Sequence, residues 1–210
     1  GLLPTLISDT PQAMQEALQA ARDAIAEGVP GILGLHLEGP FLTPERCGVH
    51  RPEHFRSPSE AEIEGLCAHG LPHMLMTLAP ERVSPEAIAR LSQGGVHLCA
   101  GHSAASFEQA RAAFDAGLGG VTHLFNAMPP LSGRGPGLLG AALLDTSVYC
   151  GLIVDGHHLH PASLALALRL KPERCFLVTD AMSSGGSDLL VFVLAGGRVR
   201  VRGGRLETED

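Results

Sequence analysis

The sequence predicts an α/β fold of the (β/α)8 barrel type, and two observations lead to it. Seven apolar runs of strand length recur along the chain, and most intervals between them have the pattern of helices. Regular alternation of strand and helix implies parallel strands joined by right-handed crossovers. Polar residues follow the C-terminal ends of several strands, as in a barrel whose active site forms at that face. An open doubly wound sheet would concentrate them at one switch point.

The predicted strands are short and apolar, far below the ~20 residues that a membrane-spanning helix needs. They cover residues 2–7, 32–37, 73–78, 96–100, 120–124, 149–154 and 175–178. Because eight strands close such a barrel, we expect its first strand to be missing before Gly1.

Four helices are predicted from their start and stop signals. The starting signals are Asp9 or Thr10 before Pro11, Ser84 before Pro85, Ser106, and Pro161. The helices run from 11 toward 28, and over 87–91, 107–116 and 163–170. Serine, threonine and aspartate are good N-caps, and proline suits the first helical turn.

After Asp180 the sequence becomes small and flexible, and residues 191–194 and 198–202 alternate as short strands beside two glycine pairs. This pattern is typical of antiparallel strands with tight turns. We therefore expect a barrel that carries the chemistry over 1–185, its strands 2 to 8, followed by the truncated start of a small β domain over 186–210.

Composition limits the classes of function. The chain has 210 residues, is 45% hydrophobic and has a mean hydropathy of +0.17, as expected for one large soluble domain. Its net charge is −7 without a lysine or arginine block, which argues against nucleic-acid or membrane binding. Five cysteines without a Cys-x-x-Cys spacing and no visible signal peptide favour reduced thiols in the cytoplasm.

Three strand ends offer residues that suit a metal ion. Glu38 and His36 alternate along one strand and point to the same side, which is the interior of a barrel. A buried carboxylate is costly unless it is paired or bound to metal. His102 and His123 end two further strands, and with Glu38 they make a facial set for Zn²⁺ or Fe²⁺ with positions left open for water. Taken alone, each histidine would more often be a core histidine whose ring nitrogens are hydrogen-bonded. Glu38 alone would face solvent about as often as it would bind a metal.

Two more strand ends add candidate groups. Asp180 would face the same mouth, where a carboxylate can accept a proton from water and pass it to a leaving amine. It could equally cap the next turn. Asp155, His157 and His158 follow the preceding strand and could supply a hydrogen-bond donor to the same mouth. The two histidines could equally be surface residues.

Residues 135–140 fit the dinucleotide-binding pattern G-x-G-x-x-G. The segment before them, 128–132, does not have the pattern of a strand. A fingerprint without its strand is a weak signal, so we do not assign nucleotide binding.

The chain resembles the N-acetylglucosamine-6-phosphate deacetylase family of the amidohydrolase superfamily. The resemblance covers nearly all 210 residues and rests on the motifs HLEGP, AGHS, THLFNAM and VTDA, in that order. Shorter matches lie at residues 3–7, 133–134, 137–138, 155–156 and 158. A metal-dependent amidohydrolase barrel is the fold that this resemblance implies.

The resemblance also implies roles for individual residues. It assigns Glu38, His102 and His123 to the metal and Asp180 to acid–base catalysis. The residues implied to bind substrate are Val49, His50, Asn126, Ala127, Arg134 and His158. Among these, His158 would contact the acetamido carbonyl and help to stabilise the oxyanion, and Asn126 with Ala127 would meet the sugar phosphate.

The phosphate would also be held by His50 and Arg134, with one such cation supplied across the interface of a homodimer. The reaction implied is hydrolysis of N-acetylglucosamine 6-phosphate to glucosamine 6-phosphate and acetate, a step of amino-sugar metabolism. The number of metal ions, one or two, stays open because the family's first strand lies outside the sequence. Alternatives are N-acetylgalactosamine-6-phosphate deacetylase or another amidohydrolase, and an inactive remnant that binds sugar phosphate.

Overall fold

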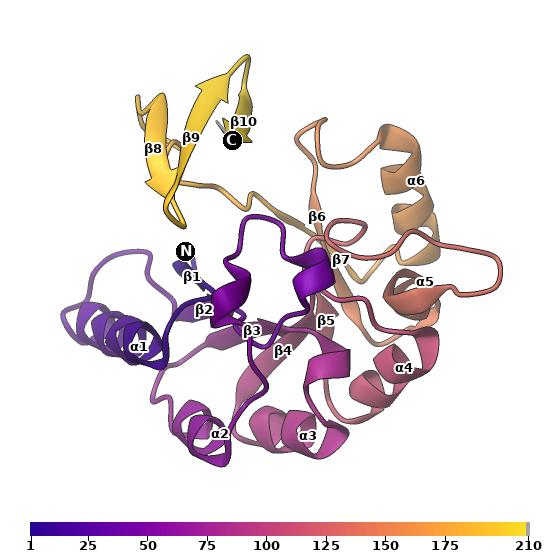
Figure 1. The fold of residues 1–210 in the computed structure, drawn as a ribbon, viewed down its shortest axis with the longest axis horizontal. Helices are drawn as coiled ribbons and strands as arrows, with labels where there is room; N and C mark the ends of the chain where they lie inside the picture. Colours follow the sequence, from indigo (N-terminus) through magenta and orange to yellow (C-terminus); the bar gives the residue numbers. More distant parts are fainter. Residues whose placement is uncertain (209–210) are drawn as a thin grey trace.

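The computed structural model describes residues 1–208, which form a curled parallel sheet wrapped by helices and a separate small sheet (Figure 1). The large sheet has seven strands in chain order. They are β1 Thr5–Ile7, β2 Leu35–Glu38, β3 Met74–Leu78, β4 Val96–Ala100, β5 Gly120–Val121, β6 Tyr149–Ile153 and β7 Cys175–Val178.

All six strand pairs of this sheet are parallel, which confirms the predicted alternation. Within residues 1–208, β1 and β7 do not pair with each other, so the sheet is curled and open. The strand predicted over 120–124 is shorter than expected. Its backbone leaves the ladder after Val121, and His123 adopts a left-handed conformation with φ of 32°.

Helices connect the strands and lie around the outside of the sheet (Figure 1). They are α1 Pro11–Ala26, α2 Glu60–Cys67, α3 Pro85–Gln93, α4 Phe107–Asp115, α5 Gly137–Leu144 and α6 Pro161–Leu170. Three short 3-10 turns, η1 Pro44–Arg46, η2 Pro52–His54 and η3 Pro80–Arg82, follow β2 and β3.

The predicted caps explain where several helices begin. The side chains of Thr10, Ser84 and Ser106 accept hydrogen bonds from the first turns of α1, α3 and α4. Each bond satisfies a backbone N–H that would otherwise have no partner. Helices α2 and α5 were not predicted. Seven of the eight residues of α5 are buried, so this helix lacks the amphipathic period that a sequence search detects.

Helix α5 also occupies the segment that resembled a dinucleotide fingerprint. Residues 129–136, directly before it, contain no strand. The glycine pattern therefore lacks the directly preceding strand that a dinucleotide-binding βαβ unit has.

The hydrophobic core lies between the sheet and its helices. Met74, Met76 and Leu78 of β3 are fully buried there, and Ile88 and Leu91 of α3 pack in the same core. All five cysteines are free thiols, of which Cys99 and Cys150 are buried and the others are half-buried.

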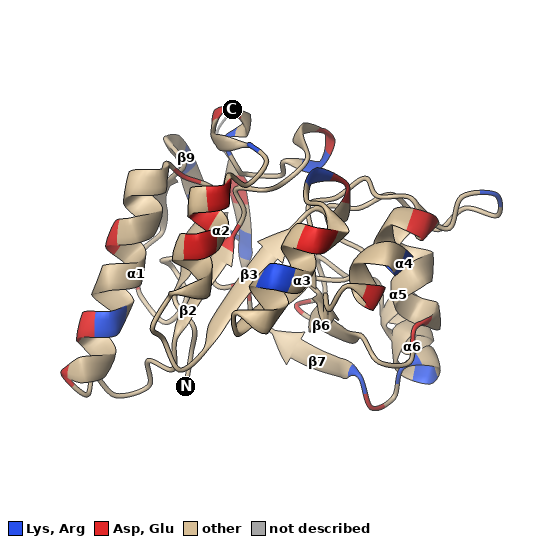
Figure 2. Cartoon of the chain, turned by 90° about the horizontal axis from the view of Figure 1, so that it is seen from below, with Lys and Arg blue, Asp and Glu red and all other residues tan. Residues whose placement is uncertain are grey.

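The three C-terminal strands form the expected antiparallel sheet, β8 Val191–Leu194, β9 Gly197–Arg202 and β10 Arg205–Thr208. In Figure 1 this small sheet (yellow) is drawn above β1, apart from the large sheet. In the view of Figure 2, acidic and basic residues alternate along the helices and loops. None of the helices described within residues 1–208 combines the length and apolarity needed to cross a bilayer.

Candidate active site

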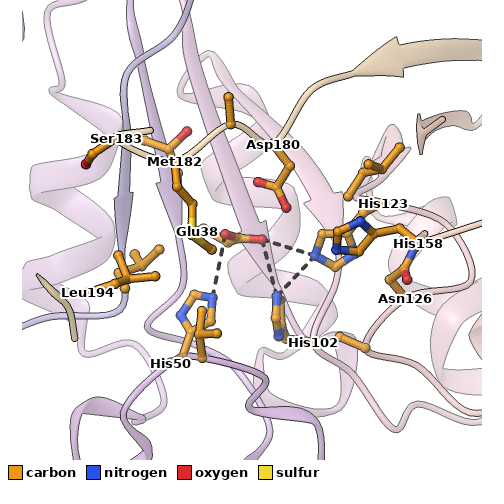
Figure 3. A pocket seen from close by; sticks show the side chains of 16 residues that line it. Glu38, His50, His102, His123, Asn126, His158, Asp180, Met182, Ser183 and Leu194 are labelled. Carbon is orange, nitrogen blue, oxygen red and sulfur yellow. Dashed lines mark hydrogen bonds and ion pairs between the residues drawn. The ribbon is translucent and has the colours of Figure 1, made fainter. Parts of the chain in front are cut away.

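A buried carboxylate surrounded by three imidazoles marks the C-terminal end of the large sheet (Figure 3). Glu38 is the last residue of β2 and is 5% exposed. Its Oε1 lies 3.3 Å from His102 Nε2 and 3.2 Å from His123 Nε2. Its Oε2 lies 3.5 Å from His50 Nε2. The three residues predicted as metal ligands therefore do come together.

Left-handed backbone brings both histidines into this position. His102 follows β4 with φ of 47°, and His123 follows β5 with φ of 32°. Phe125, Ala127 and Asp180 share this conformation, so five of the six non-glycine residues with positive φ in the described chain lie at or beside this site. Such conformations are costly and are typical of sites where geometry matters more than local stability.

The hydrogen bonds of His102 indicate which of its nitrogens is free. Its Nδ1 lies 2.8 Å from the carbonyl oxygen of Arg46, which can only accept, so Nδ1 carries the proton. The lone pair on His102 Nε2 then faces Glu38 Oε1. It also faces His123 Nε2, which lies 3.1 Å from His102 Nε2. A lone pair directed at a carboxylate oxygen is unfavourable unless a cation lies between them.

A divalent cation fits this donor set. One carboxylate oxygen and two imidazole nitrogens converge on one point, and they are ligands that Zn²⁺ and Fe²⁺ accept. The bond from His102 to a backbone carbonyl is the outer contact that fixes the tautomer of a metal-binding histidine. His123 Nδ1 is buried without a hydrogen-bond partner among the described residues.

His50 completes a second cluster with Glu38 and His102, whose ligand atoms all lie within 4.8 Å of one another. Its Nδ1, however, accepts a hydrogen bond of 3.2 Å from the backbone N–H of Ser8. The proton of a neutral His50 therefore belongs on Nε2, which points at Glu38 Oε2 as a donor. This tautomer makes His50 a hydrogen-bond donor to the carboxylate and not a ligand.

The imidazoles also control the charge of the carboxylate. Burial alone would raise the pKa of Glu38, but its close contacts with the imidazoles of His102, His123 and His50 hold this pKa well below its ordinary value. Glu38 is therefore ionised at neutral pH. Burial lowers the pKa of His36, two residues before Glu38, to about 4, so this imidazole is neutral.

Asp180 follows β7 and lines the same cavity, as predicted, with φ of 49°. Partial desolvation raises the pKa of its carboxyl group, and the negative charge of Glu38 acts in the same direction. The surrounding imidazoles act in the opposite direction. A carboxyl group with a raised pKa is better matched to proton transfer near neutral pH than an ordinary aspartate.

The cavity in front of these groups has a volume of about 350 Å³, within the ordinary range for small-molecule sites. It is lined by the predicted substrate residues Val49, His50, Asn126, Ala127 and His158. Sequence reasoning did not identify its apolar wall, which includes Met182 and Leu194 (Figure 3). Leu194 ends β8 in the other sheet, and no local pattern links that strand to the barrel mouth.

His158 is exposed and oriented by a neighbour. Asp155 accepts hydrogen bonds from the backbone N–H groups of His157 and His158, at 2.8 and 2.9 Å. Its other oxygen lies 2.7 Å from His158 Nδ1. These bonds hold the pKa of Asp155 below its ordinary value and leave His158 Nε2 free for a ligand in the cavity.

Arg134 is the one predicted substrate residue that the described structure does not bring to the cavity. It lies exposed in the loop between β5 and α5. The role implied for it, and the role of His50 at a phosphate, stay predictions.

The known proteins to which this chain is similar are deacetylases of N-acetylhexosamine 6-phosphates. The chain is 46% identical over 199 residues to an N-acetylgalactosamine-6-phosphate deacetylase of Shewanella sp. (strain ANA-3), covering 94% of this chain and 50% of that protein. It is 35% identical over 206 residues to an N-acetylglucosamine-6-phosphate deacetylase of Haemophilus influenzae, covering 97% and 54%.

The structure of N-acetylglucosamine-6-phosphate deacetylase from Pasteurella multocida superposes with a TM-score of 0.94 at 36% identity. That match covers 99% of this chain and 55% of the other. No family model matches the chain. The chain thus spans about half the length of the relatives it matches.

Proposed function

This chain is a homologue of the N-acetylglucosamine- and N-acetylgalactosamine-6-phosphate deacetylases, and from that relationship we propose that the protein is a metal-dependent deacetylase of an N-acetylhexosamine 6-phosphate. Water would cleave the acetamide to give the free amino sugar phosphate and acetate. The observation that carries the proposal is the convergence of Glu38, His102 and His123 beside Asp180 in one cavity.

Each group has a task in this reaction. Glu38, His102 and His123 would hold a divalent ion, with Zn²⁺ or Fe²⁺ as the metals that suit them. When bound, such an ion polarises a carbonyl and lowers the pKa of water. Asp180 would take the proton of the attacking water and deliver it to the leaving nitrogen.

The remaining residues would bind and orient the sugar phosphate. His158, oriented by Asp155, would donate toward the acetamido oxygen, and Asn126 with Ala127 would meet the phosphate. His50 is also proposed as a phosphate contact, although its Nε2 faces Glu38 in this structure. Val49 would add a backbone contact, because it lines the cavity beside His50.

The proposal extends to the architecture and the assembly. The seven strands would be strands 2 to 8 of an eight-stranded barrel over 1–185, and 186–210 would belong to a small β domain. We propose a cytoplasmic homodimer in which Arg134 of one subunit serves the phosphate of the other. The exposed position of Arg134, away from the cavity of its own chain, supports this arrangement.

The metal site is tested by removing its ligands one at a time. His102→Ala and His123→Ala should each lose most of the bound metal, because a two-ligand remainder binds a divalent ion weakly, and the fold should persist. Metal content by mass spectrometry and circular dichroism measure the two effects. His69→Ala, a buried histidine in the loop between α2 and β3, is the control. Stoichiometric metal in both ligand variants would show that the ion is held elsewhere.

The substrate epimer has a second candidate, because the relative at 46% identity is a galactosamine enzyme and the one at 35% a glucosamine enzyme. Release of acetate from both N-acetylhexosamine 6-phosphates would be compared at equal concentration. We expect both to react, with a preference for the galactosamine epimer. A clear preference for N-acetylglucosamine 6-phosphate would reject this second candidate, and no release from either would reject the deacetylase proposal.

A further inference from the structure

One layer below the candidate metal ligands, four polar side chains form a hydrogen-bonded row across the inner face of the sheet. Thr5 Oγ1 of β1 lies 3.1 Å from His36 Nδ1 of β2. His36 Nε2 lies 2.8 Å from Thr77 Oγ1 of β3. Thr77 Oγ1 lies 2.7 Å from the hydroxyl of Thr122, which directly follows β5. We call these four residues the Thr–His row.

The members of the Thr–His row adjoin the residues that carry the metal site. His36 precedes Glu38 by two positions and therefore lies on the same face of β2. Thr77 is the Cα partner of Glu38 in the ladder between β2 and β3. Thr122 is the residue directly before His123.

The third ligand, His102, is tied to the row through the residue before it. A Cβ atom added at Gly101 would lie 2.7 Å from Thr77 Cγ2 and 3.1 Å from Thr122 Cβ. The backbone that leads into His102 therefore rests directly on two threonines of the row. A side chain at this position would force them apart.

A hydrogen-bonded row constrains geometry in a way that apolar packing does not. Contacts between aliphatic side chains are non-directional, whereas a hydrogen bond weakens steeply with distance and angle. The imidazole of His36 is rigid and presents its two nitrogens to the strands on either side. It thus fixes β1 and β3 relative to β2, at the ends where the ligands begin.

We propose that His36 is a positioning residue for the metal site, because by bridging Thr5 and Thr77 it sets the spacing of the strand ends that carry the three ligands. This inference rests on the proposed metal-dependent function and adds a residue to it. It predicts that breaking the row changes the coordination geometry of a bound ion while all three ligands are still present.

The test uses the full chain, stripped of metal and titrated with Co²⁺, whose visible absorption reports coordination geometry. His36→Leu removes both hydrogen bonds at similar volume, and Thr77→Val removes one hydroxyl without changing shape. Both should weaken Co²⁺ binding about 10- to 100-fold, the scale of outer contacts at metal sites, and alter the absorption spectrum. Thr77→Ser keeps the hydroxyl and should behave like the unaltered protein.

His69→Leu is the matched control, since His69 is also buried and accepts a hydrogen bond of 3.0 Å from the backbone of Leu71. It lies before β3, at the opposite end of the sheet. Thermal unfolding of the metal-free proteins measures the loss of stability in each variant. His69→Leu should lose stability but keep the Co²⁺ affinity and spectrum.

Unchanged affinity and spectrum in Thr77→Val would overturn the inference, even if His36→Leu failed to fold. Equal weakening by His69→Leu would overturn it too, because the effect would then be general instability. An unaltered protein that binds no Co²⁺ would reject the metal site itself, and with it the inference. That result differs from one in which the unaltered protein binds and the row variants bind equally well.

Discussion

Among single residues, Asp180 offers the sharpest test of the chemistry. Asp180→Asn keeps the size of the side chain but cannot take up a proton. If Asp180 shuttles the proton, kcat for deacetylation should fall by about 10² or more. Bound metal should be unchanged, because the three ligands are untouched. Steady-state kinetics with the sugar phosphate and metal analysis measure both quantities.

Asp188→Asn makes the matching change at an exposed carboxylate that does not line the cavity. It should leave kcat unchanged. A near-normal rate in Asp180→Asn would mean that another group carries the proton, and His158 would be the next candidate in this cavity.

The sequence identified residues at strand ends more reliably than residues in loops. Glu38, His102 and His123 could be predicted because the C-terminal ends of parallel strands lie at one face of the sheet. That rule does not depend on the path of the loops. The contact between His50 and Glu38 could not be predicted from the sequence. It depends on the path of the long loop after β2, which is set by tertiary bonds such as that from Ser8 to His50.

At the scale of elements, regular segments were predictable and irregular ones were not. Helices with a serine cap and an amphipathic face, such as α3 and α4, follow the prediction closely. Helix α5 was missed because it is apolar on all sides, so neither a helical nor a strand period stands out. Strand β5 is shorter than its apolar run, because the site requires left-handed backbone where the run continues.

The close approach of β4 to its neighbours gives a prediction at this scale. Gly101→Ala would place a methyl group 2.7 Å from Thr77 Cγ2, and overpacking of this kind costs about 1–3 kcal/mol of unfolding free energy. It should also displace His102 and weaken metal binding. Denaturant unfolding of the metal-free protein and metal titration measure the two effects.

Gly119→Ala is the matched control. Nothing lies within 4 Å of a Cβ added at Gly119, and its φ is not in the left-handed region. Its stability should be unchanged or slightly higher, because alanine restricts the unfolded chain. A contrary result would be a Gly101→Ala protein that matches Gly119→Ala both in unfolding free energy and in metal affinity. In that case the packing of Gly101 against Thr77 and Thr122 would be looser than the distances indicate.

At the scale of the whole chain, the negative net charge disfavours the approach of an anionic ligand. The chain carries a net charge of −7, so the proposed dianionic sugar phosphate would approach an unfavourable overall field. Binding must therefore come from a few focused donors. Asn126 and His50, which are proposed to contact the phosphate, line the cavity, but Arg134 lies outside it. In the proposed homodimer, Arg134 would instead reach the phosphate in the cavity of the other subunit.

Hybrid dimers decide whether Arg134 acts across an interface. Arg134→Ala alone should raise KM for the sugar phosphate about 10- to 100-fold, through loss of a charge-assisted pair. A purified dimer of one Arg134→Ala subunit and one Asp180→Asn subunit has one cavity with Asp180 from its own chain and Arg134 from its partner. With two-fold symmetry, that single site should restore about half of the unaltered activity at low substrate. If Arg134 served its own cavity, neither site of the hybrid would be intact, and activity would stay near that of the single variants.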